Sequence, residues 1–320
     1  MNQTKLINNE DVKKALTPDL LIPLMRDVMK EVHTGEIESM PRIGSRMETK
    51  NIFALMGAVI PRLQICGCKN AIFPGPTTTT HQSVVSLFDT VTGELKALVS
   101  AEYITIVRTA ATSAAITDVL ARKESKVLCI MGAGNQGQNH ARAIAKVRDL
   151  EEIRFFDVFE ASAKKAAEML AEELPGVKTV YSTNAEEMVR GADIICTVSR
   201  ATEPILFGEW LKPGCHVNAV GACAPFIREL DLSVLKASKV YVDTYDCAKG
   251  SAGDLLIPIK NGEYSFDEVI GQVGAVINGE IPGRESEDEI TLFETCGLSA
   301  QDIVAANEAW KVMEGTTFEF

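Results

Sequence analysis

The sequence predicts an α/β protein in which a doubly wound parallel sheet domain is joined to a second, α+β domain. Beyond Lys123, short apolar runs alternate with stretches of helical length, as in a parallel sheet covered on both faces. A glycine-rich turn follows the first of these runs and opens a helix. Between residues 52 and 100 the texture differs, because short β-like runs follow one another directly, which is typical of an antiparallel meander.

The N-terminal part begins with helices. Thr17 and Pro18 supply a capping residue and a proline at the first helical position, and apolar residues then recur at helical spacing until Gly35. Four β-like runs follow, with a turn at Thr92-Gly93 between the last two, and a long Ala/Thr/Ile stretch over 101–120 is predicted to be helical. The four runs are 52–56, 62–66, 83–89 and 95–100.

The second part has the alternation expected of a parallel sheet. The predicted strands are 126–132, 153–159, 177–182, 192–199, 215–222 and 239–244. The predicted helices are 138–147, 161–174, 185–191 and 230–236, followed by a final amphipathic helix over 299–314.

Composition excludes several classes of function. The chain of 320 residues is 46% hydrophobic and 24% charged, and no run reaches the ~18 apolar residues of a membrane span. Its formal charge of −12 and the absence of Lys/Arg clusters argue against a nucleic-acid partner. The N-terminus lacks the apolar segment of a secretory signal, and the eight cysteines contain no Cys-x-x-Cys pair. We therefore expect a cytoplasmic protein with reduced cysteines and without a metal, because Cys66-x-Cys68 has no second pair nearby.

The glycine-rich turn fits the Rossmann dinucleotide fingerprint G-x-G-x-x-G. The turn supplies Gly132, Gly134 and Gly137, with Asn135 and Gln136 between the last two, and it lies between a strand and a helix. Glycines permit a tight turn and a close approach to the pyrophosphate, while the helix N-terminus offers unpaired N–H groups to the negative charge. A glycine turn without a ligand is the alternative.

Asp157 bears on the choice of cofactor. It lies twenty residues after Gly137, where this motif has an acid that binds the ribose hydroxyls. A carboxylate there repels a 2′-phosphate, and the following residues include no arginine to bind one, so NAD is favoured over NADP. If Asp157 is only a helix cap, this preference disappears.

Several segments resemble the ornithine cyclodeaminase/mu-crystallin superfamily. Residues 201–231 are the most similar, above all to the mu-crystallin branch of ketimine reductases. The resemblance implies an NAD-binding Rossmann domain over 119–295, and a substrate-binding and dimerisation domain formed by 1–118 and 296–320. It also implies a homodimer, or an assembly of dimers, that interconverts amino acids and imines with NAD(P). Further matches are Thr80-His81-Gln82, the 108–111 segment, Ser251-x-Gly253-Asp254 and Pro258-Ile259.

The resemblance assigns three basic residues to the substrate. Arg42 and Arg108 match arginines at the substrate carboxylate, and guanidinium groups suit that role because they bind carboxylates bidentately. Lys69 matches a lysine beside the reacting nitrogen and carbon, where nearby cations and burial lower a lysine pKa. From the sequence alone, Arg42 and Lys69 lie in polar turns and could be solvated, whereas Arg108 lies inside an apolar helix. Thr109 is assigned to the cofactor.

Two further residues remain open. Cyclodeaminases carry an aspartate where this chain has Cys223, so we expect ornithine cyclisation to be weak or absent. A thiol replaces a carboxylate poorly as a base, and Cys223 is either a catalytic group or, on its chemistry, a packing residue. His81 could be a general base or a strand-end histidine.

The expected reaction is hydride transfer to or from the carbon that bears the nitrogen of a small amino or imino acid. The nicotinamide side would be lined by residues at the ends of two neighbouring strands, namely Thr197, Val198, Ser199, Val220, Gly221 and Ala222. The alternatives are an ornithine cyclodeaminase, an oxidative amino-acid dehydrogenase, a condensing enzyme, and a catalytically silent crystallin-like binding protein.

Overall fold

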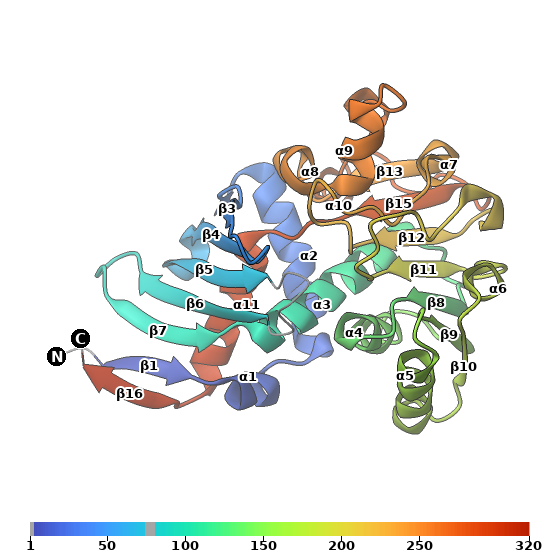
Figure 1. Cartoon of the computed structure of the whole chain (residues 1–320). Helices are drawn as coiled ribbons and strands as arrows, with labels where there is room; N and C mark the ends of the chain where they lie inside the picture. The colour runs from blue at the N-terminus through green and yellow to red at the C-terminus, as the bar shows by residue number, and fades with distance from the viewer. Residues whose placement is uncertain (1–2, 74–80, 320) are drawn as a thin grey trace. The chain divides into compact units, whose positions relative to one another are not determined.

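The structure is a computed structural model that describes residues 3–73 and 81–319 (Figure 1). Thr80 of one family match therefore lies outside the described residues. The chain forms two compact units, unit 1 with Met1–Arg108 and Leu298–Phe320, and unit 2 with Thr109–Gly297. The first boundary falls inside helix α3 (Glu102–Leu120), ten residues before the domain boundary expected from the sequence. The domain limits at 118 and 296 stay a prediction.

Unit 1 is built on an eight-stranded sheet in the order β16-β1-β7-β6-β5-β4-β2, with β3 also paired to β4. The meander β4 to β7 is antiparallel, as predicted. The prediction of a single strand over 62–66 is wrong. A 3₁₀ turn over Pro61–Leu63 lies there, and strand β5 begins only at Ile65. The strands are β1 (Gln3–Ile7), β2 (Glu38–Ser39), β3 (Ile43–Arg46), β4 (Ile52–Ile60), β5 (Ile65–Phe73), β6 (Gln82–Asp89), β7 (Leu95–Ser100) and β16 (Thr316–Glu319).

One face of this sheet is covered by α11 (Ser299–Val312), which packs on β4 to β7. Helices α1 (Asn9–Ala15) and α2 (Pro18–Thr34) pack on α11 in turn, so α11 is buried almost all round. The ends of α2 follow the predicted signals, since the Thr17 hydroxyl accepts from the Leu20 N–H and Gly35 adopts the left-handed conformation at φ 78°.

Unit 2 contains a parallel sheet in the order β10-β9-β8-β11-β12-β15-β13-β14. All six predicted strands are present, and β15 is a further strand that lies between β12 and β13. The strand order reverses between β8 and β11, where open α/β sheets bind ligands at the carboxyl ends of the strands. The strands are β8 (Val127–Met131), β9 (Glu152–Phe156), β10 (Lys178–Ser182), β11 (Ile194–Thr197), β12 (His216–Ala219), β13 (Ser238–Val242), β14 (Gly271–Gln272) and β15 (Ile290–Glu294).

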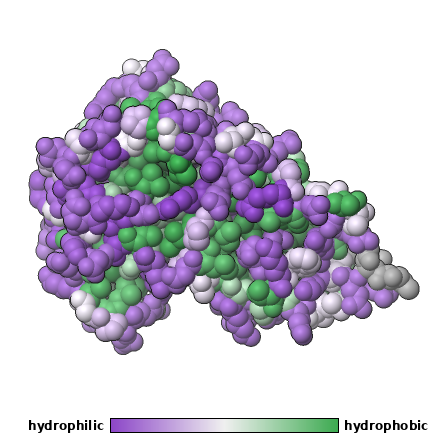
Figure 2. Space-filling view, turned by 180° about the vertical axis from the view of Figure 1, so that it is seen from behind, coloured by the Kyte–Doolittle hydropathy of each residue, from purple (hydrophilic) through white to green (hydrophobic). Residues whose placement is uncertain are grey.

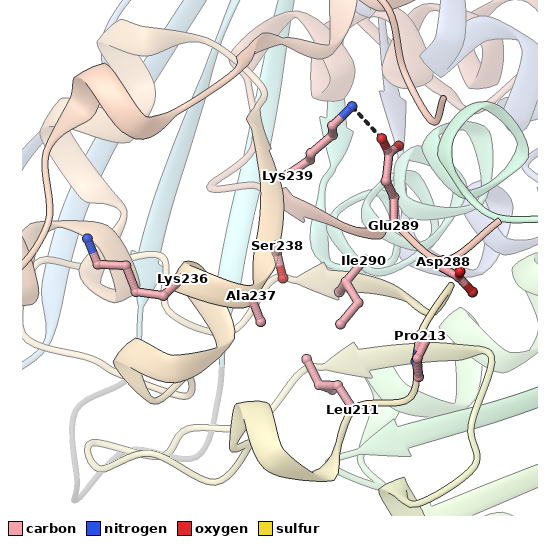
Figure 3. A pocket seen from close by; sticks show the side chains of 9 residues that line it. All are labelled: Leu211, Pro213, Lys236, Ala237, Ser238, Lys239, Asp288, Glu289 and Ile290. Atoms are coloured by element: carbon pink, nitrogen blue, oxygen red, sulfur yellow. Dashed lines mark ion pairs between the residues drawn. The ribbon is translucent and has the colours of Figure 1, made fainter. Parts of the chain in front are cut away.

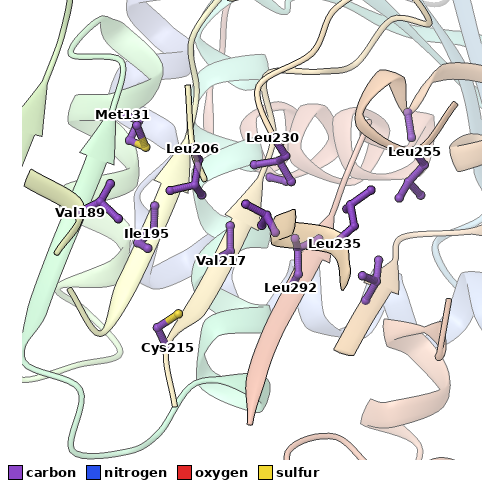
Figure 4. Packing of buried hydrophobic residues seen from close by; sticks show 14 of the residues in the cluster. Met131, Val189, Ile195, Leu206, Cys215, Val217, Leu230, Leu235, Leu255 and Leu292 are labelled. Atoms are coloured by element: carbon purple, nitrogen blue, oxygen red, sulfur yellow. The ribbon is translucent and has the colours of Figure 1, made fainter. Parts of the chain in front are cut away.

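Side chains alternate between the two faces of this sheet. Ile195, Val217 and Leu292 belong to the apolar cluster on one face, which also contains Leu235 and Leu255 from helices (Figure 4). On the other face Asn218 donates to the Thr117 hydroxyl of α3. The helices are α4 (Asn135–Ile144), α5 (Glu160–Glu173), α6 (Ala185–Val189), α7 (Leu232–Ala237), α8 (Tyr245–Ser251), α9 (Gly253–Lys260) and α10 (Val273–Ile277).

The visible surface is mainly polar, as expected for a chain rich in charged residues. The face seen in Figure 2 is mostly hydrophilic, with apolar side chains gathered in a few places. Within residues 3–73 and 81–319, no helix has the length and apolar character to cross a membrane.

Candidate active site

The glycine loop of unit 2 has the geometry of a phosphate-binding turn. Gly132 has φ 117°, a conformation that L side chains avoid. A Cβ on Gly137 would collide with the Gly132 carbonyl, whereas one on Gly134 would meet open space. Gly134 is the N-cap of α4 and supplies no side-chain cap. No side chain therefore caps the N–H groups of this helix end, and the exposed Gly134 and Asn135 border the space in front of it.

Asp157 lies directly after β9 and faces the same loop. One carboxylate oxygen accepts from the Ala133 N–H at 2.9 Å and the other from the Phe159 N–H at 3.0 Å. The N-cap of α5 is Phe159, so Asp157 does not cap that helix. The alternative reading as a helix cap is wrong, and a half-buried carboxylate stands beside the glycine loop.

The two loops expected on the nicotinamide side follow β11 and β12, which are parallel neighbours. Val198 touches the glycine loop, because a Cβ on Gly132 would lie 2.8 Å from its carbonyl oxygen. Thr197 accepts from the N–H groups of Val220 and Gly221 through its carbonyl oxygen. The glycine loop and both strand-end loops thus form one contiguous edge of the unit 2 sheet; Ala222 there is buried.

Unit 1 carries the basic residues. Lys69 does not lie in a polar turn, as its local sequence suggested; it is in the middle of β5, on the face covered by α11, and its side chain is fully buried. Its ammonium donates to the Thr105 hydroxyl at 2.6 Å and to Asp302 Oδ1 at 2.9 Å. Burial, together with the charges of Arg108 and Arg42, lowers the Lys69 pKa to about 8 against the opposing effect of Asp302.

Asp302 links two of the basic residues. The same Oδ1 accepts from Arg108 Nε at 3.2 Å, and Arg108 also donates to the Gln301 side chain at 2.7 Å. Asp302 is fully buried, and although burial raises its pKa, the Arg108 and Lys69 charges outweigh this and the pKa is lowered. Its Oδ2 is buried without a hydrogen-bond partner among the described residues. The sequence analysis did not identify Asp302 and Gln301. Their only signal was that both are polar residues within the predicted helix 299–314, and their burial is seen only in the structure.

Arg42 is the third basic residue predicted to bind the substrate. It precedes β3, is half-buried, and its guanidinium lies 5.4 Å from the Phe73 ring centroid. Its charge makes a small contribution to the lowered pKa of Lys69, after burial and the charge of Arg108. Of the three predicted substrate residues, Lys69 and Arg108 are brought together by Asp302, and Arg42 lies beside Phe73 at the end of β5.

The remaining candidates are placed as follows. His81 is half-buried immediately before β6, with its ring 5.1 Å from that of Phe73. Cys223 is half-buried after β12 and packs against the apolar cluster of unit 2. Thr109 and Gln136 are half-buried in α3 and α4.

Potential metal ligands and a further hollow also bear on what the described part of the chain can bind. Among the described residues, no three His, Cys, Asp or Glu side chains are grouped to hold a metal ion. A hollow of about 310 Å³ lies at the amino ends of β13 and β15, away from the glycine loop (Figure 3). Its Lys239 pairs with Glu289 at 2.7 Å and with Glu285 at 2.5 Å. The hollow therefore offers little net charge to an ionic ligand.

A doubly wound sheet with a dinucleotide turn, in a chain that also buries a lysine among arginines, places the protein among the NAD(P)-dependent oxidoreductases. The sequence pattern of the ornithine cyclodeaminase/mu-crystallin family matches residues 2–316. The chain belongs to this family.

Its relatives are imino-acid reductases. It is 40% identical over 228 residues to the Δ1-pyrroline-2-carboxylate reductase of Bacillus cereus, covering 71% of this chain and 70% of the relative. It is 39% identical over 233 residues to the ketimine reductase mu-crystallin of Macropus fuliginosus, covering 73% and 70%.

Two solved structures extend the similarity to the whole chain. The Thermococcus litoralis Δ1-pyrroline-2-carboxylate reductase in complex with NADH and L-proline superposes with a TM-score of 0.92 at 29% identity, covering 96% of this chain and 97% of that one. An archaeal alanine dehydrogenase dimer with bound NAD superposes with a TM-score of 0.93 at 28% identity, covering all of both chains.

Proposed function

We propose that this protein is an NADH-dependent imino-acid reductase, which transfers a hydride to the C=N carbon of a small 2-imino acid and runs in reverse as an amino-acid dehydrogenase. The observation that carries the proposal is the buried Lys69, held by Asp302, whose carboxylate also binds Arg108. The names of the relatives make the cyclic Δ1-pyrroline-2-carboxylate the first substrate to test.

In this proposal unit 1 binds the substrate. Arg42 and Arg108 hold the carboxylate and so orient the imine carbon. Lys69 exchanges a proton with the substrate nitrogen, and a pKa of about 8 supports this role because both protonation states are accessible near neutral pH. Asp302 keeps the ammonium in one orientation and supports its charged form.

Unit 2 holds the cofactor. The glycine loop and the uncapped N-terminus of α4 fit a pyrophosphate, and Asp157 fits two ribose hydroxyls but repels a 2′-phosphate. NADH, when bound, supplies the hydride. We therefore assign NADH rather than NADPH as the reductant.

The cyclodeaminase alternative is less well supported. The position of the family aspartate is occupied by Cys223, whose side chain packs against the apolar cluster. A packed thiol supplies no base for ammonia loss. Imine reduction needs a hydride and one proton, and Lys69 is available for the proton.

We also propose a homodimer through the sheet of unit 1. Its face opposite α11 carries half-exposed apolar side chains, and a hollow of about 680 Å³ is lined partly by Phe53, Ile72 and Val84. A second copy of this face would cover it, and the alanine dehydrogenase relative is a dimer. A cytoplasmic location is supported by the eight cysteines, none of which forms a disulfide.

The proposal is tested by following NADH oxidation with a panel of cyclic and acyclic 2-imino acids, repeated with NADPH. We expect turnover with stoichiometric NADH oxidation and a clear preference for NADH. Ammonia and proline formed from ornithine with only catalytic NAD would identify a cyclodeaminase instead. Tight NADH binding without turnover across the whole panel would identify a silent binding protein.

A further inference from the structure

One buried carboxylate joins the two strand-end loops of unit 2. Glu229 is fully buried, and its Oε1 accepts from both the N–H and the hydroxyl of Ser199 at 2.6 Å. Its Oε2 accepts from the Gly221 N–H at 2.9 Å. The same side chain therefore bonds to the loop after β11 and to the loop after β12. A Cβ on Gly221 would collide with this carboxylate, so the contact requires glycine there.

Glu229 is itself held by the Ser251-x-Gly253-Asp254 segment. Asp254 is fully buried, and its Oδ1 accepts from the N–H groups of Glu229 at 2.7 Å and Leu230 at 2.8 Å. The Gly253 N–H donates to the Ala222 carbonyl at 2.9 Å, at the other end of the same loop. A Cβ on Gly253 would collide with carbonyl oxygens of that loop, so the start of α9 can brace it only with glycine at this position.

Burying the carboxylates of Glu229 and Asp254 costs free energy, which argues that they have a function beyond packing. A carboxylate in a dry interior destabilises the fold unless several donors stabilise it. Two such carboxylates are linked here, because Asp254 accepts from the backbone N–H of Glu229. The apolar cluster of unit 2 already packs this region without them. What the carboxylates add is a fixed position for the backbone of Ser199 and Gly221.

We propose that Glu229 is a positioning residue for the cofactor, whose carboxylate holds the loops at Ser199 and Gly221 in the arrangement that receives the nicotinamide ring, with Asp254 positioning Glu229 in turn. This rests on the proposed function, since that function places the nicotinamide beside these loops. The glycine loop is included in the arrangement, because Gly132 contacts Val198 next to Ser199. The substrate residues of unit 1 have no part in it.

The first test is Glu229→Gln, measured as the dissociation constant of NADH by fluorescence titration of the full chain. Glutamine has one acceptor oxygen, so either Ser199 or Gly221 loses its partner. We expect NADH binding to weaken about tenfold, as for the loss of a charge-assisted hydrogen bond, and the KM for the imino acid at saturating NADH to change less than about twofold.

The matched control is Asp193→Asn. The Asp193 carboxylate also holds backbone N–H groups in unit 2, those of Lys126 at 2.8 Å and Val127 at 2.9 Å, but beside the amino end of β8. This variant should lower the melting temperature and leave NADH affinity unchanged. If Glu229→Gln behaves in the same way, Glu229 is only structural and the proposal is overturned.

A double-variant comparison tests the contact itself. Gly221→Ala should weaken NADH binding about tenfold in the wild-type background, because its methyl group displaces the Glu229 carboxylate. In a Glu229→Ala background the methyl group has room, and the same change should cost less than about twofold. Additive losses would overturn the proposal. Measuring NADH binding also separates the role of Glu229 from the proposed function. If the wild-type protein binds NADH but reduces no imine, the proposed function is refuted and the role of Glu229 is not.

Discussion

The substitution Asp302→Asn tests the chemistry assigned to Lys69. The Lys69 ammonium and Asp302 Oδ1 are 2.9 Å apart, and both side chains are fully buried. Asparagine keeps an acceptor oxygen but removes the negative charge that opposes burial and the two arginines. Loss of an opposite charge at this distance lowers a lysine pKa by about one to three units, at about 1.4 kcal/mol per unit. We therefore expect the Lys69 pKa to fall from about 8 to well below 7.

The pH dependence of imine reduction reports this change. The protonated amine is the proton donor, so kcat/KM of the wild-type enzyme should decline as pH rises through about 8. In the variant the decline should begin about one to three pH units lower, as the Lys69 pKa does. The reverse reaction needs the neutral amine, and its rising limb should move in the same direction. NADH oxidation and NAD reduction at about ten pH values between 5.5 and 10 measure both limbs.

Stability gives a second readout of the same substitution. A lysine whose folded pKa lies below its unfolded value makes the unfolding free energy rise with pH between the two values. The Lys69 contribution to the unfolding free energy of the wild-type protein does not change with pH below about pH 8. The variant should be less stable than the wild type by about 3 kcal/mol at low pH, and its unfolding free energy should rise from about pH 6 upward. The control is Asp89→Asn, at an exposed turn where the carboxylate pairs with Lys96. An unshifted limb in Asp302→Asn, or one moved to higher pH, would refute the role of Asp302.

Three further outcomes are expected. Arg108→Leu should abolish turnover while NADH affinity in fluorescence titration stays within about twofold, because Arg108 acts on the substrate carboxylate; loss of NADH binding would show that it is misplaced. Asp157→Ser should reduce the preference for NADH over NADPH in kcat/KM by about tenfold or more, and an unchanged ratio would remove the argument from Asp157. Leu55→Lys puts a charge on the sheet face opposite α11, and sedimentation velocity should then show monomers; an unaltered assembly would place the interface elsewhere.

Much of unit 2 could be predicted because its signals are local. An apolar run followed by a helical stretch identifies a strand and its crossover without knowledge of the rest of the chain, and all six predicted strands are present. The glycine loop and Asp157 are recognised by spacing alone, since they lie on consecutive elements of one βαβ unit. The position of β15 between β12 and β13 was not predictable in this way, because strand order depends on pairing between distant segments.

The amino-acid sequence by itself determined the class of fold, the dinucleotide turn and the residue types that suit an anionic substrate. Only the tertiary structure decided what surrounds Lys69, because its partner Asp302 is 233 residues away on α11. The same holds for Glu229, whose carboxylate reaches Ser199 across 30 residues and depends on Asp254 from a third segment. Burial and charge pairing arise from contacts between segments, and a pattern of neighbours along the chain contains no record of them.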